Sequence, residues 1–283
     1  MTDTYQPAEP IWCAGCGHFG VEGALARALS DLSIPKEETL ILAGIGCSGT
    51  IQNNLGTYGY HALHGRVLPT ATGAWMANPK LTVIAAGGDG DGYAIGMGHL
   101  IHTFRHNPSF TYIAMNNGVY GLTKGQNSPT RRGTRPIDAV LLGLSVLETT
   151  FIARGFTRAP DQLRELTVLA LEHARAGHGF AFLEVLSPCV TYNDTYALWD
   201  AEYVDLDTDG EHDPTNRPEA FSRVTELHAE GRIPIGLIHH SEREPTAALA
   251  DPSAADIGPD SHIASYQDVL SRYKIETEPL NTP

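Results

Sequence analysis

The sequence predicts an α/β fold in which a mostly parallel, doubly wound sheet is covered by helices on both faces. Short apolar runs alternate with stretches of helical periodicity over roughly the first 190 residues. Apolar strands that are not interrupted by polar residues are typical of parallel sheets buried on both faces. In addition, several runs end in loops rich in glycine, asparagine or cysteine, and doubly wound sheets bind ligands at the carboxyl ends of their strands.

The expected elements follow one another in strand–helix order. Short strands of apolar and β-branched residues are expected at Thr39–Ala43, Leu81–Ala86, Phe110–Met115, Thr150–Ala153 and Phe180–Leu186. Helices, recognised by apolar residues that recur at helical spacing, are expected at Phe19–Asp31, Tyr93–His106, Ile137–Leu147 and Asp161–Ala176. This alternation implies parallel strands joined by helical crossovers.

The composition narrows the class of protein. Of the 283 residues, 42 % are hydrophobic, which is ordinary for a globular protein with a core. No apolar run is long enough to span a bilayer, and Met1–Pro10 lacks the basic and apolar parts of a signal peptide. We therefore expect a cytoplasmic protein with reduced thiols and no membrane partner. The net charge of −14 and the lack of a basic segment argue against nucleic acid as a partner.

Charge divides the chain into two parts. Residues 200–283 hold 18 acidic and 6 basic residues, whereas residues 1–199 hold 15 and 13. The strand–helix pattern also fades beyond about residue 195, where prolines and short apolar runs such as Ile233–Ile238 follow. We expect residues 1–199 to form the main domain and residues 200–283 an irregular acidic extension, either solvated or packed against a partner subunit.

A glycine-rich acidic loop follows the second expected strand. In Gly88-Asp89-Gly90-Asp91 the glycines would let the backbone approach a diphosphate, and the helix that follows would attract its charge. One carboxylate, that of Asp89 or of Asp91, could ligate a Mg²⁺ ion that bridges two phosphates. Asn117, at the end of the next strand, could add a side-chain oxygen and the region of Val119 a carbonyl. The dinucleotide fingerprint does not fit, because its third glycine is missing.

All four cysteines of the chain lie in loops marked by glycine or proline: Cys13, Cys16, Cys47 and Cys189. A redox dithiol would use only the close pair, and a structural zinc site usually draws on two close pairs. An iron–sulfur cluster with four cysteine ligands accepts one close pair and two distant single cysteines. Each distant cysteine taken alone could be a small buried side chain, but two at the same sheet edge favour a shared metal centre.

Five motifs occur in the order in which they occur in one known family. They are Trp12-Cys13-Ala14-Gly15-Cys16-Gly17, Ile45-Gly46-Cys47-Ser48, Gly87-Gly88-Asp89-Gly90-Asp91, Asn117–Gln126 and Ser187-Pro188-Cys189. Through them residues 11–196 resemble the beta subunit of 2-oxoacid:ferredoxin oxidoreductases. The run Tyr120–Gln126 is the most specific part. One departure is Ala14, where the family often has proline, and that position supplies no ligand.

The resemblance implies a thiamine-diphosphate-binding domain in residues 1–199, with thiamine diphosphate, Mg²⁺ and a [4Fe–4S] cluster as cofactors. The implied cluster ligands are Cys13, Cys16, Cys47 and Cys189, and the implied Mg²⁺ ligands are Asp89, Asn117 and Val119. The implied cofactor-binding residues are Cys47, Ser48, His64, Gly88, Asp89, Gly90, Asp91, Asn117, Val119, Tyr120, Gly121, Leu122 and Thr123.

The reaction implied by the resemblance is the oxidative decarboxylation of a 2-oxoacid with coenzyme A. It yields acyl-CoA, CO₂ and reduced ferredoxin, and its reverse would fix CO₂. The chain would act with an alpha subunit, as a heterodimer that pairs into a dimer of heterodimers. We expect the alpha subunit to supply the glutamate that activates the thiamine, and Glu22 of this chain to face solvent instead.

Two residues are candidates for catalysis. His64 could donate a hydrogen bond to a diphosphate in either tautomer, and Lys124 could pair with a substrate carboxylate. A structural histidine and an exposed loop lysine are the ordinary alternatives. Lys124 favours a dicarboxylate such as 2-oxoglutarate as the substrate, with pyruvate as the alternative.

Two further hypotheses differ in class. A thiamine-dependent decarboxylase without redox chemistry would leave the cysteines unused. An iron–sulfur electron-transfer protein would leave the Gly-Asp-Gly loop and Asn116-Asn117 unused. The content of iron–sulfur cluster and of thiamine diphosphate separates these hypotheses from the first.

Overall fold

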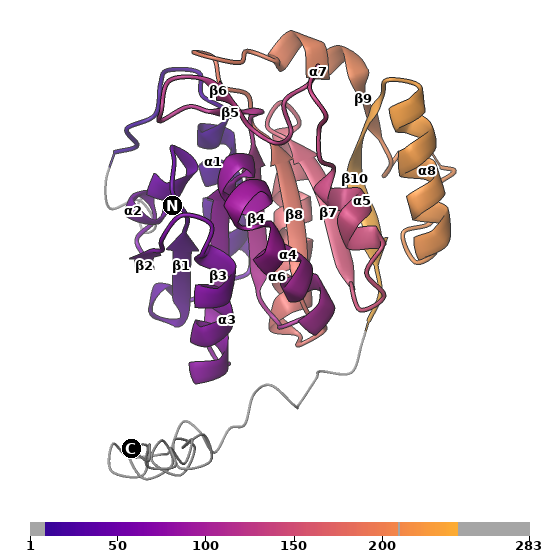
Figure 1. Ribbon diagram of the computed structural model, residues 1–283. Helices are drawn as coiled ribbons and strands as arrows, with labels where there is room; N and C mark the ends of the chain where they lie inside the picture. Colours follow the sequence, from indigo (N-terminus) through magenta and orange to yellow (C-terminus); the bar gives the residue numbers. More distant parts are fainter. Residues whose placement is uncertain (1–8, 209, 243–283) are drawn as a thin grey trace, which may run out of the picture.

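The computed structural model describes residues 9–208 and 210–242. In these residues an eight-stranded sheet forms the centre of the molecule, and helices pack on both of its faces (Figure 1). The strand order is β2-β1-β3-β4-β8-β7-β10-β9, and every neighbouring pair except β7 and β10 is parallel. The predicted α/β class with a mostly parallel sheet is therefore confirmed. No described helix is long and apolar enough to cross a bilayer.

The five expected strands are all present, with boundaries that shift by a few residues at most. The strands of the sheet are β1 (Thr39–Ala43), β2 (Tyr58–His61), β3 (Thr82–Gly88), β4 (Thr111–Asn116), β7 (Phe151–Phe156), β8 (Ala181–Leu186), β9 (Tyr203–Asp205) and β10 (Ile233–His240). A separate two-stranded ribbon consists of β5 (Val119–Tyr120) and β6 (Gln126–Asn127). The strands β2, β9 and β10 were not expected from the sequence.

The four expected helices are present as α1, α4, α5 and α6. The α-helices of the described residues are α1 (His18–Asp31), α2 (Ile51–Asn54), α3 (Val67–Ala77), α4 (Met97–His106), α5 (Ala139–Leu144), α6 (Pro160–Arg175), α7 (Tyr196–Glu202) and α8 (Arg217–Ala229), with 3₁₀ turns at Lys36–Glu38 and Ser48–Thr50. The expected helix from residue 93 begins as a π-helical turn, Asp91–Ile95, before α4.

Alternate residues of the central strands face two separate cores, which explains why these strands are apolar throughout. Ile41, Ile84 and Ile113 pack with α1 and α6 on one face. Their neighbours Leu42 and Val83 pack with α3, α4, α5 and α8 on the other. Side chains that alternate with a period of two leave no solvated face in the centre of the sheet.

Residues 200–242 differ from the irregular extension that we expected. β10 pairs antiparallel with β7, β9 pairs parallel with β10, and α8 buries Ala220, Val224 and Leu227 in the second core. These elements were missed because β9 has only three residues, because proline, glycine and histidine interrupt the apolar run of β10, and because α8 buries only three of its side chains. The domain boundary at residue 199 stays a prediction, and residues 243–283 of the acidic extension lie outside the described residues.

A buried ionic network joins β7 to β8 beneath the carboxyl edge of the sheet. Arg154 is 4 % exposed and donates from Nε to Glu184 Oε2 at 2.5 Å and from Nη2 to Asp138 Oδ2 at 2.8 Å. Glu184 Oε1 accepts from the Tyr93 hydroxyl at 3.0 Å and from Asn116 Nδ2 at 3.1 Å. Burial opposes the charge of Asp138, but Arg154 keeps the pKa of that carboxyl below its usual value.

We predict that Arg154→Met lowers the free energy of unfolding by about 3–5 kcal/mol, because it leaves the buried carboxylate of Glu184 without its cation and removes one of the two basic neighbours of the partly buried Asp138. Urea unfolding of the purified chain measures this loss. Arg158→Met is the matched control, since the Arg158–Asp200 pair is half exposed at 3.4 Å and should cost less than about 1 kcal/mol. Equal losses in the two variants would contradict a structural role for the buried network.

Candidate functional site

A cavity of about 330 Å³ lies at the carboxyl ends of β1, β3 and β4, beside the β5–β6 ribbon. All the residues that the resemblance assigned to cofactor binding line it: Cys47, Ser48, His64, Gly88, Asp89, Gly90, Asp91, Asn117, Val119, Tyr120, Gly121, Leu122 and Thr123. His18, Ile45 and Gly46 also line the cavity and were not expected. The sequence therefore identified one continuous site, and the role of each residue in it stays a prediction.

Asp89 is almost completely buried and is held by hydroxyl groups. Its Oδ2 accepts hydrogen bonds from Ser128 Oγ and from Thr130 Oγ1, the latter at 2.5 Å, and its Oδ1 faces the backbone N–H of Asn117 at 3.5 Å. Burial raises the pKa of Asp89, and the hydroxyls act in the opposite direction. No basic side chain among the described residues forms an ion pair with Asp89. A metal cation would therefore stabilise its ionised form.

Asp91 has a different set of contacts. Its Oδ1 accepts from the backbone N–H groups of Ile45 at 3.0 Å and Gly65 at 2.8 Å, and His64 Nδ1 lies 2.9 Å from the same oxygen. Asp91 therefore ties the loop after β1 to the loop before α3. These contacts use one oxygen of Asp91, and the other, Oδ2, is buried without a hydrogen-bond partner among the described residues. The choice of Asp89 as the carboxylate that faces a metal therefore stays a prediction.

Two histidines line the cavity in different environments. His18 is 1 % exposed, and its Nδ1 lies 2.6 Å from Ser187 Oγ. Burial lowers the pKa of His18 to about 4, so the ring is neutral near pH 7. The side chain of His64 is 40 % exposed, and with Nδ1 next to Asp91 its Nε2 is left for a ligand.

The turn after β4 presents Asn117 and Val119 to the cavity. Asn117 Oδ1 accepts from the backbone N–H of Val119 at 3.0 Å, and Gly118 between them has a φ of +69°. The neighbouring Asn116 Oδ1 accepts from Gly118 N at 3.2 Å and from Thr130 Oγ1 at 2.8 Å. Side-chain to backbone bonds of this kind fix a turn in one conformation.

The loops that carry the cysteines are joined to one another. Trp12 Nε1 donates to the Cys47 carbonyl at 2.7 Å, which joins the N-terminal loop to the loop after β1. The backbone N–H of Gly17 donates to the Pro188 carbonyl at 3.0 Å. A methyl group on Gly17 would lie 2.6 Å from the carbonyl carbon of Ser187, so only glycine allows this approach of the N-terminal loop to the loop after β8.

The four thiols are free and close enough to influence one another. Burial, followed by the charges of Cys189, Cys47 and Cys13, raises the pKa of Cys16 to about 11. Burial and two of the same neighbours also raise the pKa of Cys47. A methyl group on Gly121 would lie 3.3 Å from Cys47 Sγ and 4.0 Å from Cys189 Sγ, so these two sulfurs share one neighbour.

The placement of the four cysteines can be compared with what a zinc ion and an iron–sulfur cluster each require. No three Cys, His, Asp or Glu side chains in the described part of the chain are placed to hold a single metal ion. A zinc ion requires its ligands to converge on one point, whereas each thiolate of a four-iron cluster binds a different iron. A four-iron cluster with all four cysteines as ligands stays a prediction at this point.

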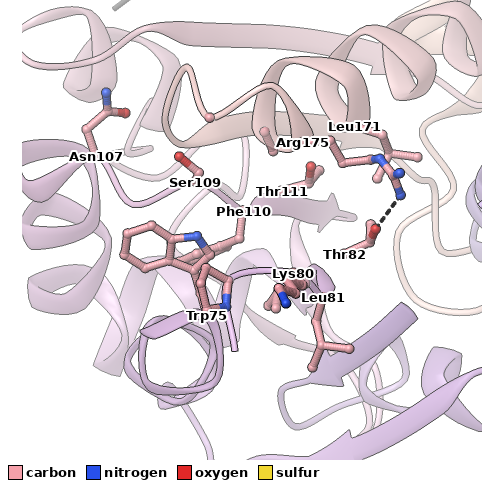
Figure 2. Close-up of a pocket in the computed structure, with 14 residues that line it drawn as sticks. Trp75, Lys80, Leu81, Thr82, Asn107, Ser109, Phe110, Thr111, Leu171 and Arg175 are labelled. Carbon is pink, nitrogen blue, oxygen red and sulfur yellow. Dashed lines mark hydrogen bonds between the residues drawn. The ribbon is translucent and has the colours of Figure 1, made fainter. Parts of the chain in front are cut away.

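Another cavity, of about 450 Å³, lies at the amino ends of β3 and β4, opposite the carboxyl ends that form the candidate site (Figure 2). Trp75, Lys80 and Arg175 are among its lining residues, and Arg175 Nη1 donates to Thr82 Oγ1 at 2.7 Å. None of the motif residues lies there. It is therefore separate from the candidate site.

Comparison with known proteins identifies the family. Residues 44–185 match the family model of the thiamine pyrophosphate enzyme C-terminal TPP-binding domain, and residues 189–252 match the model of the C-terminal part of the pyruvate ferredoxin oxidoreductase beta subunit. A 2-oxoacid:ferredoxin oxidoreductase subunit beta from Sulfolobus is 38 % identical over 265 residues, which cover 86 % of this chain and 85 % of that relative. The chain belongs to the beta subunits of 2-oxoacid:ferredoxin oxidoreductases. The resemblance carried by the five motifs is confirmed, as is the assignment to an oxidoreductase.

The names of two further similar proteins include a substrate. The 2-oxoglutarate oxidoreductase subunit KorB of Mycobacterium tuberculosis is 36 % identical over 66 % of this beta subunit and 52 % of its own length. A solved 2-oxoglutarate:ferredoxin oxidoreductase from Magnetococcus marinus, with 2-oxoglutarate, coenzyme A and succinyl-CoA bound, has a TM-score of 0.80 and 31 % identity. That comparison covers 100 % of this beta subunit and 96 % of the solved chain, which supports the thiamine-enzyme type of fold.

The cavity of this beta subunit fits thiamine diphosphate, in agreement with the matched TPP-binding domain. A methyl group on Gly90 would lie 2.3 Å from Tyr120 Cε1, so the loop after β3 can pack against the loop after β4 only with glycine there. The same loop opens the π-helical turn, whose N-terminal N–H groups suit a phosphate. Asp89 adds a buried carboxylate without a cation, which suits Mg²⁺.

Several site features of the beta subunit differ from expectation or were missed. Lys124 is exposed, has a φ of +74° and does not line the cavity. Glu22, which we expected to face solvent, is 3 % exposed, because α1 buries that position. Ser128 and Thr130, which hold Asp89, carry no sequence signal beyond following the Asn117 turn, because hydroxyl residues are common in any loop.

We predict that alkylation of Cys16 in the metal-free beta subunit increases with pH around 11, rather than around the usual thiol value near 9. The raised pKa keeps Cys16 protonated at neutral pH, and only the thiolate reacts. Iodoacetamide labelling across pH, read by mass spectrometry of the Cys16 peptide, measures the rate. An inflection near 9 would contradict a buried group of mutually repelling thiols.

Proposed function

We propose that this beta subunit binds thiamine diphosphate through Mg²⁺, carries a [4Fe–4S] cluster, and catalyses oxidative decarboxylation of a 2-oxoacid together with an alpha subunit. The products would be acyl-CoA, CO₂ and reduced ferredoxin, and the reverse reaction would fix CO₂. One observation supports the proposal most: Cys47 lines the cavity that holds Asp89 and Asn117, and Gly121 of the same cavity lies against Cys47 and Cys189.

The magnesium ligands in this proposal are Asp89, Asn117 and the Val119 carbonyl. Ser128 and Thr130 hold one oxygen of Asp89, which leaves the other, next to Asn117, for the metal. Asp91 would hold the surrounding loops in place. The exposed ring nitrogen of His64 would donate to the diphosphate.

The cluster ligands are Cys13, Cys16, Cys47 and Cys189. Binding of iron favours their thiolate forms, which burial and mutual repulsion otherwise oppose. When bound, thiamine diphosphate supplies an electron sink for decarboxylation, and the cluster supplies a one-electron acceptor. The protein holds the two groups at one edge of the sheet.

The alpha subunit is expected to complete the site and to supply the glutamate that activates thiamine. The name of the matched family, beta subunit, supports such a partner. We propose a heterodimer that pairs into a dimer of heterodimers, located in the cytoplasm. Packing of the acidic part of the chain, residues 200–283, against this partner stays a prediction.

The favoured substrate is 2-oxoglutarate. The KorB relative and the solved structure both carry this substrate in their names, although the Sulfolobus relative is named only for 2-oxoacids and one matched family model for pyruvate. Lys124 directly follows the cavity-lining residue Thr123 and would pair with the distal carboxylate of the substrate. Pyruvate, without that carboxylate, would not need Lys124.

We predict that the two cofactor sites can be removed separately. Cys47→Ser in the alpha–beta complex should lose most of its iron, whereas Asp89→Ala should keep its iron and weaken Mg²⁺–thiamine diphosphate binding about tenfold or more. Iron assay under anaerobic conditions and thiamine diphosphate titration measure the two effects. Unchanged iron content in Cys47→Ser would reject Cys47 as a cluster ligand. Unchanged cofactor affinity in Asp89→Ala would indicate Asp91, not Asp89, as the Mg²⁺ ligand.

We predict that the complex reduces ferredoxin or a viologen dye faster with 2-oxoglutarate than with pyruvate, in a coenzyme-A-dependent reaction. Lys124→Met should raise KM for 2-oxoglutarate about tenfold and leave KM for pyruvate unchanged, because it removes one charge-assisted contact. Lys80→Met, at the opposite edge of the sheet, is the matched control. Faster turnover of pyruvate, or an equal effect of Lys124→Met on both substrates, would overturn the substrate assignment.

A further inference from the structure

Asn193 lies between the two candidate cofactor sites and contacts both of their loops. Its backbone N–H donates to the Cys189 carbonyl at 2.9 Å, which closes a tight turn after the last cysteine. Its side-chain Nδ2 donates to the Asn117 carbonyl at 2.7 Å. One residue therefore links the loop of a proposed cluster ligand to the loop of a proposed magnesium ligand.

The side chain of Asn193 packs tightly against the turn that contains Asn117 and Gly118. A methyl group on Gly118 would lie 2.6 Å from Asn193 Nδ2, so the amide sits directly against the backbone of the turn. Gly118 also has a φ of +69°, which favours glycine for a second reason. The turn can therefore not shift toward Cys189 without moving the side chain of Asn193.

The same segment of chain reaches the cysteine sulfurs further along. Four residues after Asn117, Gly121 lies against Cys47 Sγ and Cys189 Sγ. The segment 117–121 thus starts at the proposed magnesium ligand, held by Asn193, and ends at two proposed cluster ligands. A displacement at one end is transmitted to the other through a short, hydrogen-bonded piece of backbone.

We propose that Asn193 is a positioning residue that couples the oxidation state of the cluster to the binding of Mg²⁺–thiamine diphosphate; this inference rests on the proposed function. A change in charge at the cluster alters the forces on the Cys189 loop, and Asn193 passes the change to the Asn117 turn. Because coupling between two sites is reciprocal, the ratio of cofactor affinities in the oxidised and reduced protein measures it directly.

The test is a titration of the alpha–beta complex with Mg²⁺–thiamine diphosphate, in the oxidised state and after reduction with dithionite. The wild-type complex should show different affinities in the two states. Asn193→Ala should keep its iron, bind the cofactor about three- to tenfold more weakly, as expected for one lost hydrogen bond, and show nearly equal affinities in the two states.

Asn193→Asp is the second variant, since it keeps the size of the side chain and removes the N–H donor; it should lose the difference between states in the same way. Asn78→Ala is the matched control, because the side chain of Asn78 also bonds to backbone, at the C-terminus of α3 and away from both sites. It should behave as wild type.

The inference is overturned if the wild-type affinities are equal in both states, or if both Asn193 variants keep the wild-type difference. Loss of iron in both variants, in parallel with affinity, would show that Asn193 only supports the fold of the cluster loop. Absence of a cluster or of cofactor binding in the wild-type complex would instead reject the proposed function itself.

Discussion

The parallel register of β1, β3, β4 and β8 is the constraint on which the rest of this structure depends. Parallel neighbours end at a common edge, so the loops after these strands meet although they are far apart in sequence. That edge receives Cys47, the Gly-Asp-Gly loop, the Asn117 turn and Cys189. The buried pairing of Arg154 with Glu184 holds β7 against β8 beneath it, and Glu184 in turn fixes Asn116. A slip of one strand would separate the groups that the proposed chemistry needs together.

Two sets of groups at this edge, the partly buried thiols and the buried Asp89, lie without an opposite charge beside them. The thiols repel one another when ionised, and Asp89 is buried among hydroxyls with a raised pKa. Negative charge on either set destabilises the folded protein. A cationic group bound to that set would make the charged form favourable. These electrostatic properties support the proposal that the site holds metal groups. The other buried charges, around Arg154, are paired and need no ligand.

Much of the fold and of the site could be predicted because the informative patterns are local. The strand β1 was predicted at its observed limits, and the cavity-lining loops follow directly from strand ends and glycines. The strand β10 was missed because Pro234 and Gly236 interrupt its apolar run, and both residue types are uncommon inside strands. Ser128, Thr130 and Asn193 were missed because their roles arise from hydrogen bonds across 39, 41 and 76 residues, for which a single sequence holds no signal.

The central claim is that one edge of one sheet holds an iron–sulfur cluster next to thiamine diphosphate. The most direct test is the cofactor stoichiometry of the alpha–beta complex purified without oxygen. Our account predicts about four iron and four acid-labile sulfide per beta subunit from this chain's cysteines, after allowance for any clusters in the partner, together with one thiamine diphosphate. Zinc without acid-labile sulfide, or a cluster without bound thiamine diphosphate, would contradict it.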